Sequence, residues 1–147
     1  MRGNVAPIAF THSITIEAPP ERVWQALVTP QIVDIYHLAP LALIEPRLDG
    51  RMLYGQVEHP LISGRITAWL PPTCFAHTFR FDPDAHDQTD ADPETLVEYA
   101  LQPVGDATLL TLHHTGFACE NQTYTNIRDG WPYILGGLKA TVEDQPP

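Results

Sequence analysis

The spacing of apolar residues changes near residue 120, from every second position to every third or fourth. Before that point, segments such as 74–81 and 109–115 alternate apolar and polar side chains and are separated by short turns, a pattern typical of antiparallel strands. Beyond it, apolar residues from Tyr124 to Val142 recur at helical spacing, over a length of roughly 30 Å that can cross a small sheet. The sequence therefore predicts an α+β fold that ends in one long helix.

Three residues inside this predicted helix disfavour helical structure. Pro132 removes one hydrogen bond and its ring clashes with the carbonyl of Arg128, so we expect the helix to be interrupted near Pro132. Gly136 and Gly137 each cost roughly 1 kcal/mol relative to alanine. We expect this cost to be offset by close packing on the sheet or by room for a ligand beside Trp131.

The rest of the chain predicts strands and two short helices. Pro20 suits the first turn of a helix, because its missing N–H has no partner there in any case. One domain is natural for 147 residues, with a core of about 8–143. The predicted elements are a strand at 8–17, helices at about 20–28 and 31–37, six further antiparallel strands within 42–116, and the long helix at about 120–142.

The charge of the chain excludes some classes of partner. A formal net charge of −10 with only 8 Lys and Arg residues argues against nucleic acid, whose phosphates require a basic surface. The chain also offers neither the basic amphipathic face of a membrane-docking helix nor an apolar run of ~20 residues. Cys74 and Cys119 fit no metal spacing and the N-terminal residues no secretory signal, so we expect a cytoplasmic protein with free thiols.

Several motifs appear in a recognisable order. They are Ile-Glu-Ala-Pro-Pro-Glu-Arg-Val-Trp-Gln-Ala-Leu at 16–27, Glu-Pro-Arg-Leu-Asp-Gly-Arg-Met at 45–52, Gly-Arg-Ile-Thr at 64–67, and Gly130-Trp131 followed by Leu135, Leu138 and Lys139. The series resembles the helix-grip fold of the START-like (SRPBCC) superfamily, and more narrowly the homologues of the activator of the heat-shock-protein-ninety ATPase. Asp49 stands where that family usually has glycine. The resemblance implies a seven-stranded sheet with an interior cavity against the C-terminal helix, and it allows homodimers.

Two histidines and a tyrosine are the candidate polar groups of this cavity. Pairing the strands from their turns places two pairs of residues opposite each other: Phe81 with Thr95, and Leu101 with Leu110. His77 then faces Tyr99, and His114 lies one pair further along, all on the helix-facing side. These groups can orient a polar part of a ligand or transfer protons near neutral pH. They can equally be core residues whose hydrogen bonds are all made within the protein.

The other predicted contacts of the cavity are apolar or aromatic. We expect Tyr36 and Tyr54 at its mouth, where a ring can pack while its hydroxyl stays in water. Together with His77, Tyr99 and His114, the predicted ligand-binding residues are Tyr36, Met52, Tyr54, Phe79, Leu112, Trp131, Leu135 and Leu138.

The sequence predicts no cofactor and no metal ion. It contains neither a phosphate-binding loop nor a dinucleotide fingerprint. His113 and His114 point to opposite faces of their strand, and Glu98 should face outward, so they cannot share one ion. The acidic segment 82–94 lacks the glycine and terminal glutamate of a calcium-binding EF-hand loop.

Three functions agree with these observations. The first is binding of a small, largely apolar or aromatic molecule, since such sites combine apolar walls with a few polar groups. The second is an enzyme of the aromatase/cyclase or lyase type that uses the same His and Tyr side chains as acid and base. The third is a co-chaperone-like interaction domain whose cavity is filled.

Overall fold

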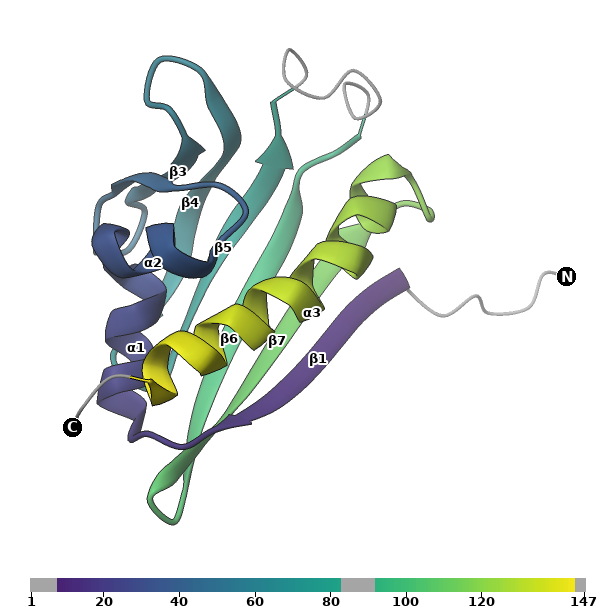
Figure 1. Cartoon of the computed structure of the whole chain (residues 1–147). Helices are drawn as coiled ribbons and strands as arrows, with labels where there is room; N and C mark the ends of the chain where they lie inside the picture. The colour runs from purple at the N-terminus through teal and green to yellow at the C-terminus, as the bar shows by residue number, and fades with distance from the viewer. Residues whose placement is uncertain (1–7, 83–91, 145–147) are drawn as a thin grey trace, which may run out of the picture.

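The computed structural model describes residues 8–82 and 92–144, so most of the acidic segment 82–94 lies outside the described residues. It has the predicted α+β architecture, with seven antiparallel strands, two short helices and a long C-terminal helix (Figure 1). In chain order the elements are β1 (Ile8–Ile16), α1 (Pro20–Val28), α2 (Pro30–Tyr36), β2 (Leu41–Ile44), β3 (Arg51–Gly55), β4 (Pro60–Leu70), β5 (Cys74–Phe81), β6 (Thr95–Val104), β7 (Ala107–Phe117) and α3 (Gln122–Glu143).

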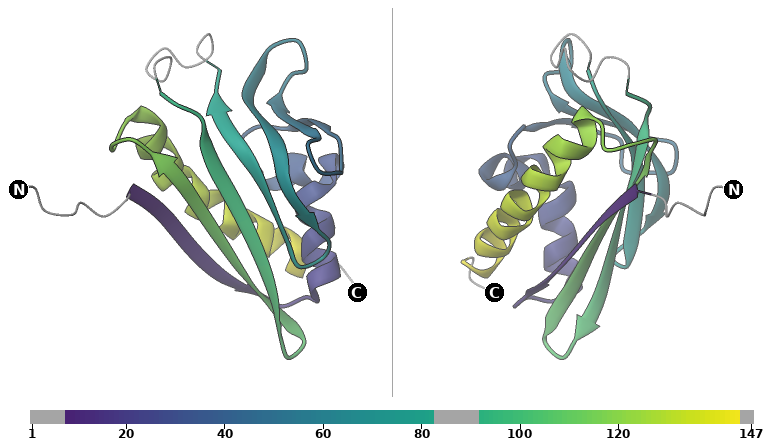
Figure 2. Two further views of the ribbon diagram at one scale, coloured as in Figure 1. Left: turned by 180° about the vertical axis from the view of Figure 1, so that it is seen from behind. Right: turned by 90° about the vertical axis from the view of Figure 1, so that its right-hand side faces the viewer.

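The strands form one sheet in the order β1-β7-β6-β5-β4-β3-β2, so only the β1–β7 pair joins strands that are distant in sequence. All three helices lie on the same face of this curved sheet (Figure 2). The alternation of apolar and polar residues explains this asymmetry, because alternate side chains point to opposite faces. Along β6, for example, Val97 and Tyr99 are buried under the helices, whereas Glu98 is exposed on the open face.

Both short helices begin at prolines, as predicted for Pro20, and α2 begins at Pro30, one residue before its predicted start. Pro20 and Pro30 occupy first-turn positions, where no backbone N–H is needed. Trp24 of α1 packs edge-on against Trp69 and Phe75, with ring centroids 5.1 and 5.2 Å away. This aromatic contact attaches α1 to one end of the sheet.

The helix α3 is continuous, and the predicted interruption near Pro132 is wrong (Figure 1). The side chain of Asn121 accepts a hydrogen bond from the Tyr124 amide at 2.9 Å and caps the start of the helix. Pro132 and Arg128 both lie on the exposed side. The carbonyl that loses its helical partner therefore faces water, which can replace the missing hydrogen bond. None of the helices in the described part of the chain is long and apolar enough to cross a membrane.

The two glycines of α3 have different surroundings, and neither packs on the sheet. A Cβ atom at Gly137 would lie 3.0 Å from the Cβ of Tyr36, so Gly137 allows a close approach of α3 to α2. A Cβ atom at Gly136 would meet nothing within 4 Å. The expectation that these glycines leave room for a ligand is therefore wrong. The predicted position of Tyr36 at a wet pocket mouth is also wrong, because its hydroxyl is buried and donates to the Ala26 carbonyl at 2.7 Å.

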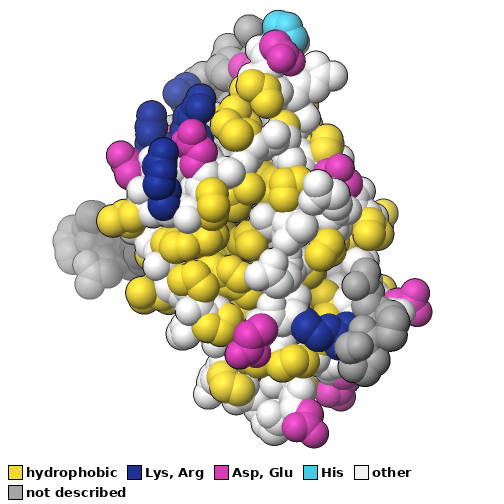
Figure 3. Space-filling model, turned by 90° about the vertical axis from the view of Figure 1, so that its left-hand side faces the viewer, with side chains coloured by type: hydrophobic (Ala, Val, Ile, Leu, Met, Phe, Trp, Pro, Cys, Tyr) yellow, Lys and Arg dark blue, Asp and Glu magenta, His cyan; other side chains and the backbone are white. Residues whose placement is uncertain are grey.

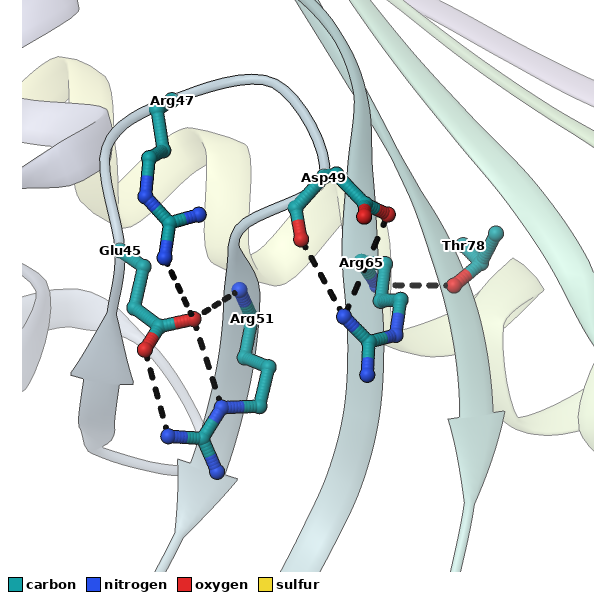
Figure 4. Close-up of polar contacts among 6 residues, drawn as sticks. All are labelled: Glu45, Arg47, Asp49, Arg51, Arg65 and Thr78. Atoms are coloured by element: carbon teal, nitrogen blue, oxygen red, sulfur yellow. Dashed lines mark hydrogen bonds and ion pairs between the residues drawn. The ribbon is translucent and has the colours of Figure 1, made fainter.

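The motif at 45–52 forms the turn between β2 and β3 (Figure 4). The Glu45 carboxylate accepts hydrogen bonds from the backbone and guanidinium of Arg51, at 2.8 to 3.3 Å, and these bonds lower the pKa of Glu45 to about 2. Asp49 adopts a positive φ of 66°, which suits the glycine more usual there, and its carbonyl accepts from Arg65 at 3.2 Å. Gly50 is required, because a Cβ atom would lie 2.0 Å from the Glu45 carbonyl oxygen. The residues of this motif therefore stabilise the turn between β2 and β3.

Candidate functional site

A pocket of about 400 Å³ opens between the first half of α3, strands β4 and β5, and the connection from α2 to β2. Its volume lies in the range of small-molecule sites, roughly 300–1,000 Å³. The lining is mostly apolar and aromatic, with one imidazole and two side-chain amides, and the described residues contribute no Lys, Arg, Asp or Glu to it. The lining residues are His37, Leu38, Ala39, Leu61, Ile62, Phe79, Phe81, Gln122, Asn126, Ile127, Gly130, Trp131 and Ile134.

Two of the predicted ligand-binding residues, Phe79 and Trp131, line this pocket. The others are buried in the core on the same side of the sheet: Tyr36, Met52, Tyr54, His77, Tyr99, Leu112, His114, Leu135 and Leu138. The pocket therefore lies nearer to the start of α3 than the sequence pattern indicates. Sequence reasoning missed His37, Gln122 and Asn126, which come from an irregular connection and from the first turns of the helix.

The strand register confirms one predicted pairing and corrects the other. Leu101 pairs with Leu110, as the tight turn between β6 and β7 predicts. Thr95 pairs with Phe79 and not with Phe81, which is a shift of two residues. The shift has a physical basis, because the Thr95 hydroxyl donates to the Phe79 carbonyl at 3.0 Å.

This shift changes which side chains face each other but not which face they occupy, since it is an even number of residues. The predicted pairing of His77 with Tyr99 is wrong: Phe75 lies opposite Tyr99. His77 lies opposite Val97, and Val97 in turn lies opposite His114. The two histidines therefore occupy one row across the sheet, on either side of Val97.

His114 makes all the hydrogen bonds that its ring allows. The indole N–H of Trp131 donates to His114 Nδ1 at 3.0 Å, so Nδ1 is an acceptor and Nε2 carries the proton. Nε2 is 2.7 Å from the Thr95 hydroxyl, which passes its own hydrogen bond to the Phe79 carbonyl. Burial lowers the pKa of His114 to about 3, with a smaller contribution from His77. His114 is therefore a neutral part of the core that fixes Trp131 against the sheet.

Unlike His114, His77 has one ring nitrogen without a hydrogen-bond partner among the described residues. Its Nδ1 lies 2.8 Å from the Thr78 carbonyl, so Nδ1 carries the proton and Nε2 presents a lone pair. Nε2 is buried and, within the described part of the chain, has no hydrogen-bond partner. Burial lowers the pKa of His77 to about 4. The protein thus holds a neutral imidazole with an unused acceptor in its interior, where an unmade hydrogen bond costs about 1–3 kcal/mol.

His37 connects the pocket with this interior. It lines the pocket, its ring stacks on Tyr54 at 4.6 Å, and it meets the edge of Trp131 at 6.2 Å. Its Nδ1 accepts from the Ala39 amide at 3.1 Å, so the proton is on Nε2. Burial and then the proximity of His77 lower the pKa of His37 to about 4. His37 is therefore neutral and presents an N–H donor.

Two tyrosines complete the interior group. Tyr54 and Tyr99 are buried, 4% exposed each. Burial raises the pKa of both phenols, so both stay protonated. The ring of Tyr99 lies 5.9 Å from His77 and 6.3 Å from Trp131. We call Tyr54, His77 and Tyr99 the inner polar layer, which lies beyond the pocket residues His37 and Trp131.

The described residues contain no group of three His, Cys, Asp or Glu side chains placed to hold a metal ion. Glu98 and His113 are exposed on the opposite face of the sheet from His114, as predicted.

Comparison with known proteins places the chain in a family. A model of the "Activator of Hsp90 ATPase homolog 1-like protein" family matches residues 17–143. The chain belongs to this family. Members share the START-like helix-grip architecture that the motifs predict, and the family assignment therefore agrees with the observed sheet and long helix.

Solved structures share the fold at low sequence identity. A protein from Mesorhizobium loti has a TM-score of 0.80 and 20% identity, over 95% of this chain and 100% of that one. An HSP90 activator from Plasmodium falciparum has a TM-score of 0.72 and 16% identity, over 90% and 94% of the two chains. The Aha1 dimer from Colwellia psychrerythraea has a TM-score of 0.70 and 17% identity, over 92% and 96%. No curated protein matches this sequence.

Proposed function

We propose that the protein binds a small, largely apolar or aromatic molecule in the pocket between the first half of α3 and strands β4 and β5. The observation that carries this proposal is the lining itself, which combines aromatic and aliphatic walls with one imidazole and two amides. Apolar walls supply most of the affinity of such sites, and a few polar groups orient the ligand. Phe79 and Trp131 supply the aromatic walls, and Gln122 and Asn126 lie at the start of α3.

The state of the histidines supports binding over proton transfer. A group that donates a proton at neutral pH needs a pKa near 7. The pKa values of His37 and His77 are lowered to about 4, so at pH 7 neither carries the second proton that it would have to give up. His114 is engaged at both ring nitrogens. These groups are therefore better suited to hold a ligand than to act as general acids.

Uptake of a neutral environment-sensitive dye, Nile red, tests the proposal. The wild-type protein should bind the dye with a blue-shifted emission and keep its circular dichroism spectrum. Gly130 lines the pocket, and a Cβ atom there would lie 3.6 Å from Leu38, so Gly130→Phe should fill the pocket and weaken dye binding by at least about tenfold.

Gly136→Phe is the matched control, because it places the same side chain in the same helix but in open solvent. Both changes replace a helical glycine and should not weaken the helix. The proposal fails if the folded wild type takes up no dye, or if the two variants bind it equally well. A co-chaperone-like interaction domain would then be the better hypothesis.

A further inference from the structure

We propose that the ligand of this pocket is an uncharged aromatic molecule with a hydroxyl group, and that this hydroxyl donates a hydrogen bond to His77 Nε2. The inference rests on the proposed function, since it specifies the chemistry of a molecule that the same pocket takes up. It is carried by the hydrogen bonds that the interior histidines make and by the one that His77 leaves open.

The bond to the Thr78 carbonyl fixes what His77 can recognise. A carbonyl oxygen only accepts, so Nδ1 must donate and the neutral ring presents a lone pair at Nε2. The side chain is 1% exposed, and Nε2 lacks a partner within the described residues. Only a hydrogen-bond donor satisfies this atom. An ether, ketone or carboxylate would bring a second lone pair against it.

His37 supplies the opposite group on the pocket side. Its Nδ1 accepts from the Ala39 amide, so Nε2–H is a donor, and His77 is close enough to help lower the pKa of His37. A hydroxyl can accept from His37 and donate to His77 at the same time. A C–H group can do neither, and the N–H of an amide or an indole has no lone pair to accept from His37. The donor at His37 Nε2 and the acceptor at His77 Nε2 therefore favour a ligand that is an alcohol or a phenol.

The surroundings disfavour a charged ligand. No Lys, Arg, Asp or Glu among the residues that the structure describes lines the pocket, and a charge moved from water into such a site is strongly disfavoured without a partner. The chain as a whole carries a formal net charge of −10. Arg47, Arg51 and Arg65 gather beside Glu45 and Asp49 at the turn between β2 and β3 (Figure 4). Basic side chains also stand at the margin, and not in the apolar centre, of the face in Figure 3.

The aromatic side chains define the route to His77. Phe79 lines the pocket and comes two residues after His77, on the same face of β5. Trp131 forms another wall and contacts the Tyr99 ring, which stacks beside His77. His37 comes from the connection between α2 and β2, outside any helix or strand. A planar ligand reaches the inner polar layer by moving the His37 ring off Tyr54 and packing against Trp131.

Four probes of one shape test this inference: 2-naphthol, 2-methoxynaphthalene, naphthalene and 2-naphthoate, each titrated by calorimetry at pH 7. 2-Naphthol should bind about tenfold more tightly than 2-methoxynaphthalene, which keeps the oxygen but lacks the donor. 2-Naphthoate should bind most weakly. In wild-type protein labelled with ¹⁵N at histidine, the His77 Nε2 resonance should move upfield with 2-naphthol and not with 2-methoxynaphthalene.

The variant His77→Phe should bind both probes but lose the preference for 2-naphthol. His113→Phe changes an exposed histidine on the opposite face and should retain the preference. If none of the four probes binds, the proposed function itself is wrong. If naphthalene binds but 2-naphthol gains nothing over the ether, or 2-naphthoate binds best, the pocket stands and the assignment of a hydroxyl to His77 is overturned. The ¹⁵N shifts decide the matter in the wild type should His77→Phe not fold.

Discussion

Lowering the pH from 7 to 4 should unfold this protein, because three histidines are buried in their neutral form. His37 and His77 have pKa values of about 4, and His114 about 3, against an ordinary value near 6.5. The unfolded chain takes up these protons from about pH 6.5 downward, whereas the folded chain takes them up only near pH 4 or below. Stability is therefore complete above pH 6.5 and is lost as the pH falls towards 4.

The expected loss is large. Each of the three histidines favours the unfolded state by about 3 kcal/mol at pH 4 relative to pH 7, and a typical domain is stable by about 5–15 kcal/mol. The carboxylate of Glu45 contributes in a lower window, because its pKa is lowered from about 4.5 to about 2 by Arg51. Circular dichroism and urea unfolding at successive pH values measure the transition.

A substitution of His77 separates the contribution of the buried histidines to this loss of stability from that of other titrating groups. His77→Phe should reduce the loss between pH 7 and pH 4 by about 3 kcal/mol, whereas His113→Phe, on the exposed face, should leave it unchanged. A wild-type free energy of unfolding that stays constant from pH 7 to pH 4 would falsify the assignment of neutral, buried imidazoles.

Trp131→Ala should lower the free energy of unfolding by about 3–5 kcal/mol, the usual cost of truncating a buried tryptophan. Trp131 is 3% exposed and meets Phe79, Tyr99 and His114 from the sheet. Its indole N–H also satisfies His114 Nδ1. Urea unfolding at pH 7 measures the effect.

Two further substitutions divide this cost into its parts. Trp131→Phe keeps an aromatic ring but leaves His114 Nδ1 without its donor, and it should cost about 1–3 kcal/mol. Tyr133→Ala changes a neighbouring aromatic residue that is 66% exposed, and it should stay within about 0.5 kcal/mol of the wild type. An unchanged unfolding midpoint for Trp131→Ala would contradict the contacts between α3 and the sheet.

The elements were predictable because local patterns set them. The two-residue periodicity fixed which side chains face the helices, and the tight turn at Gly105 and Asp106 fixed the pairing of Leu101 with Leu110. The β5–β6 pairing was not predictable, because a long connection allows any even shift without exposing an apolar side chain. The interruption at Pro132 was wrong because the local rule assumes that the lost hydrogen bond stays unmet, and at an exposed position water meets it.

The site was harder to predict than the fold. His77, Phe79 and Trp131 lie on strands or the long helix, so their inward orientation follows from periodicity. His37 lies between two elements, and no period describes its direction. The difference between His77 and His114 depends on which ring nitrogen meets a carbonyl, a hydroxyl or an indole N–H. The two partners of His114, which are Thr95 and Trp131, come from other elements of the chain and become visible only in three dimensions.

The contact between Gly137 and Tyr36 allows the shape of the pocket to change while its lining residues stay the same. Tyr36 is held by the Ala26 carbonyl at its hydroxyl and by Gly137 at its Cβ, and the next residue is His37. A larger residue at 137 would push Tyr36, and with it the His37 ring, while every side chain that lines the pocket keeps its identity. An exchange at this one position in a helix can therefore reshape the pocket, and a comparison of the lining residues alone would miss it.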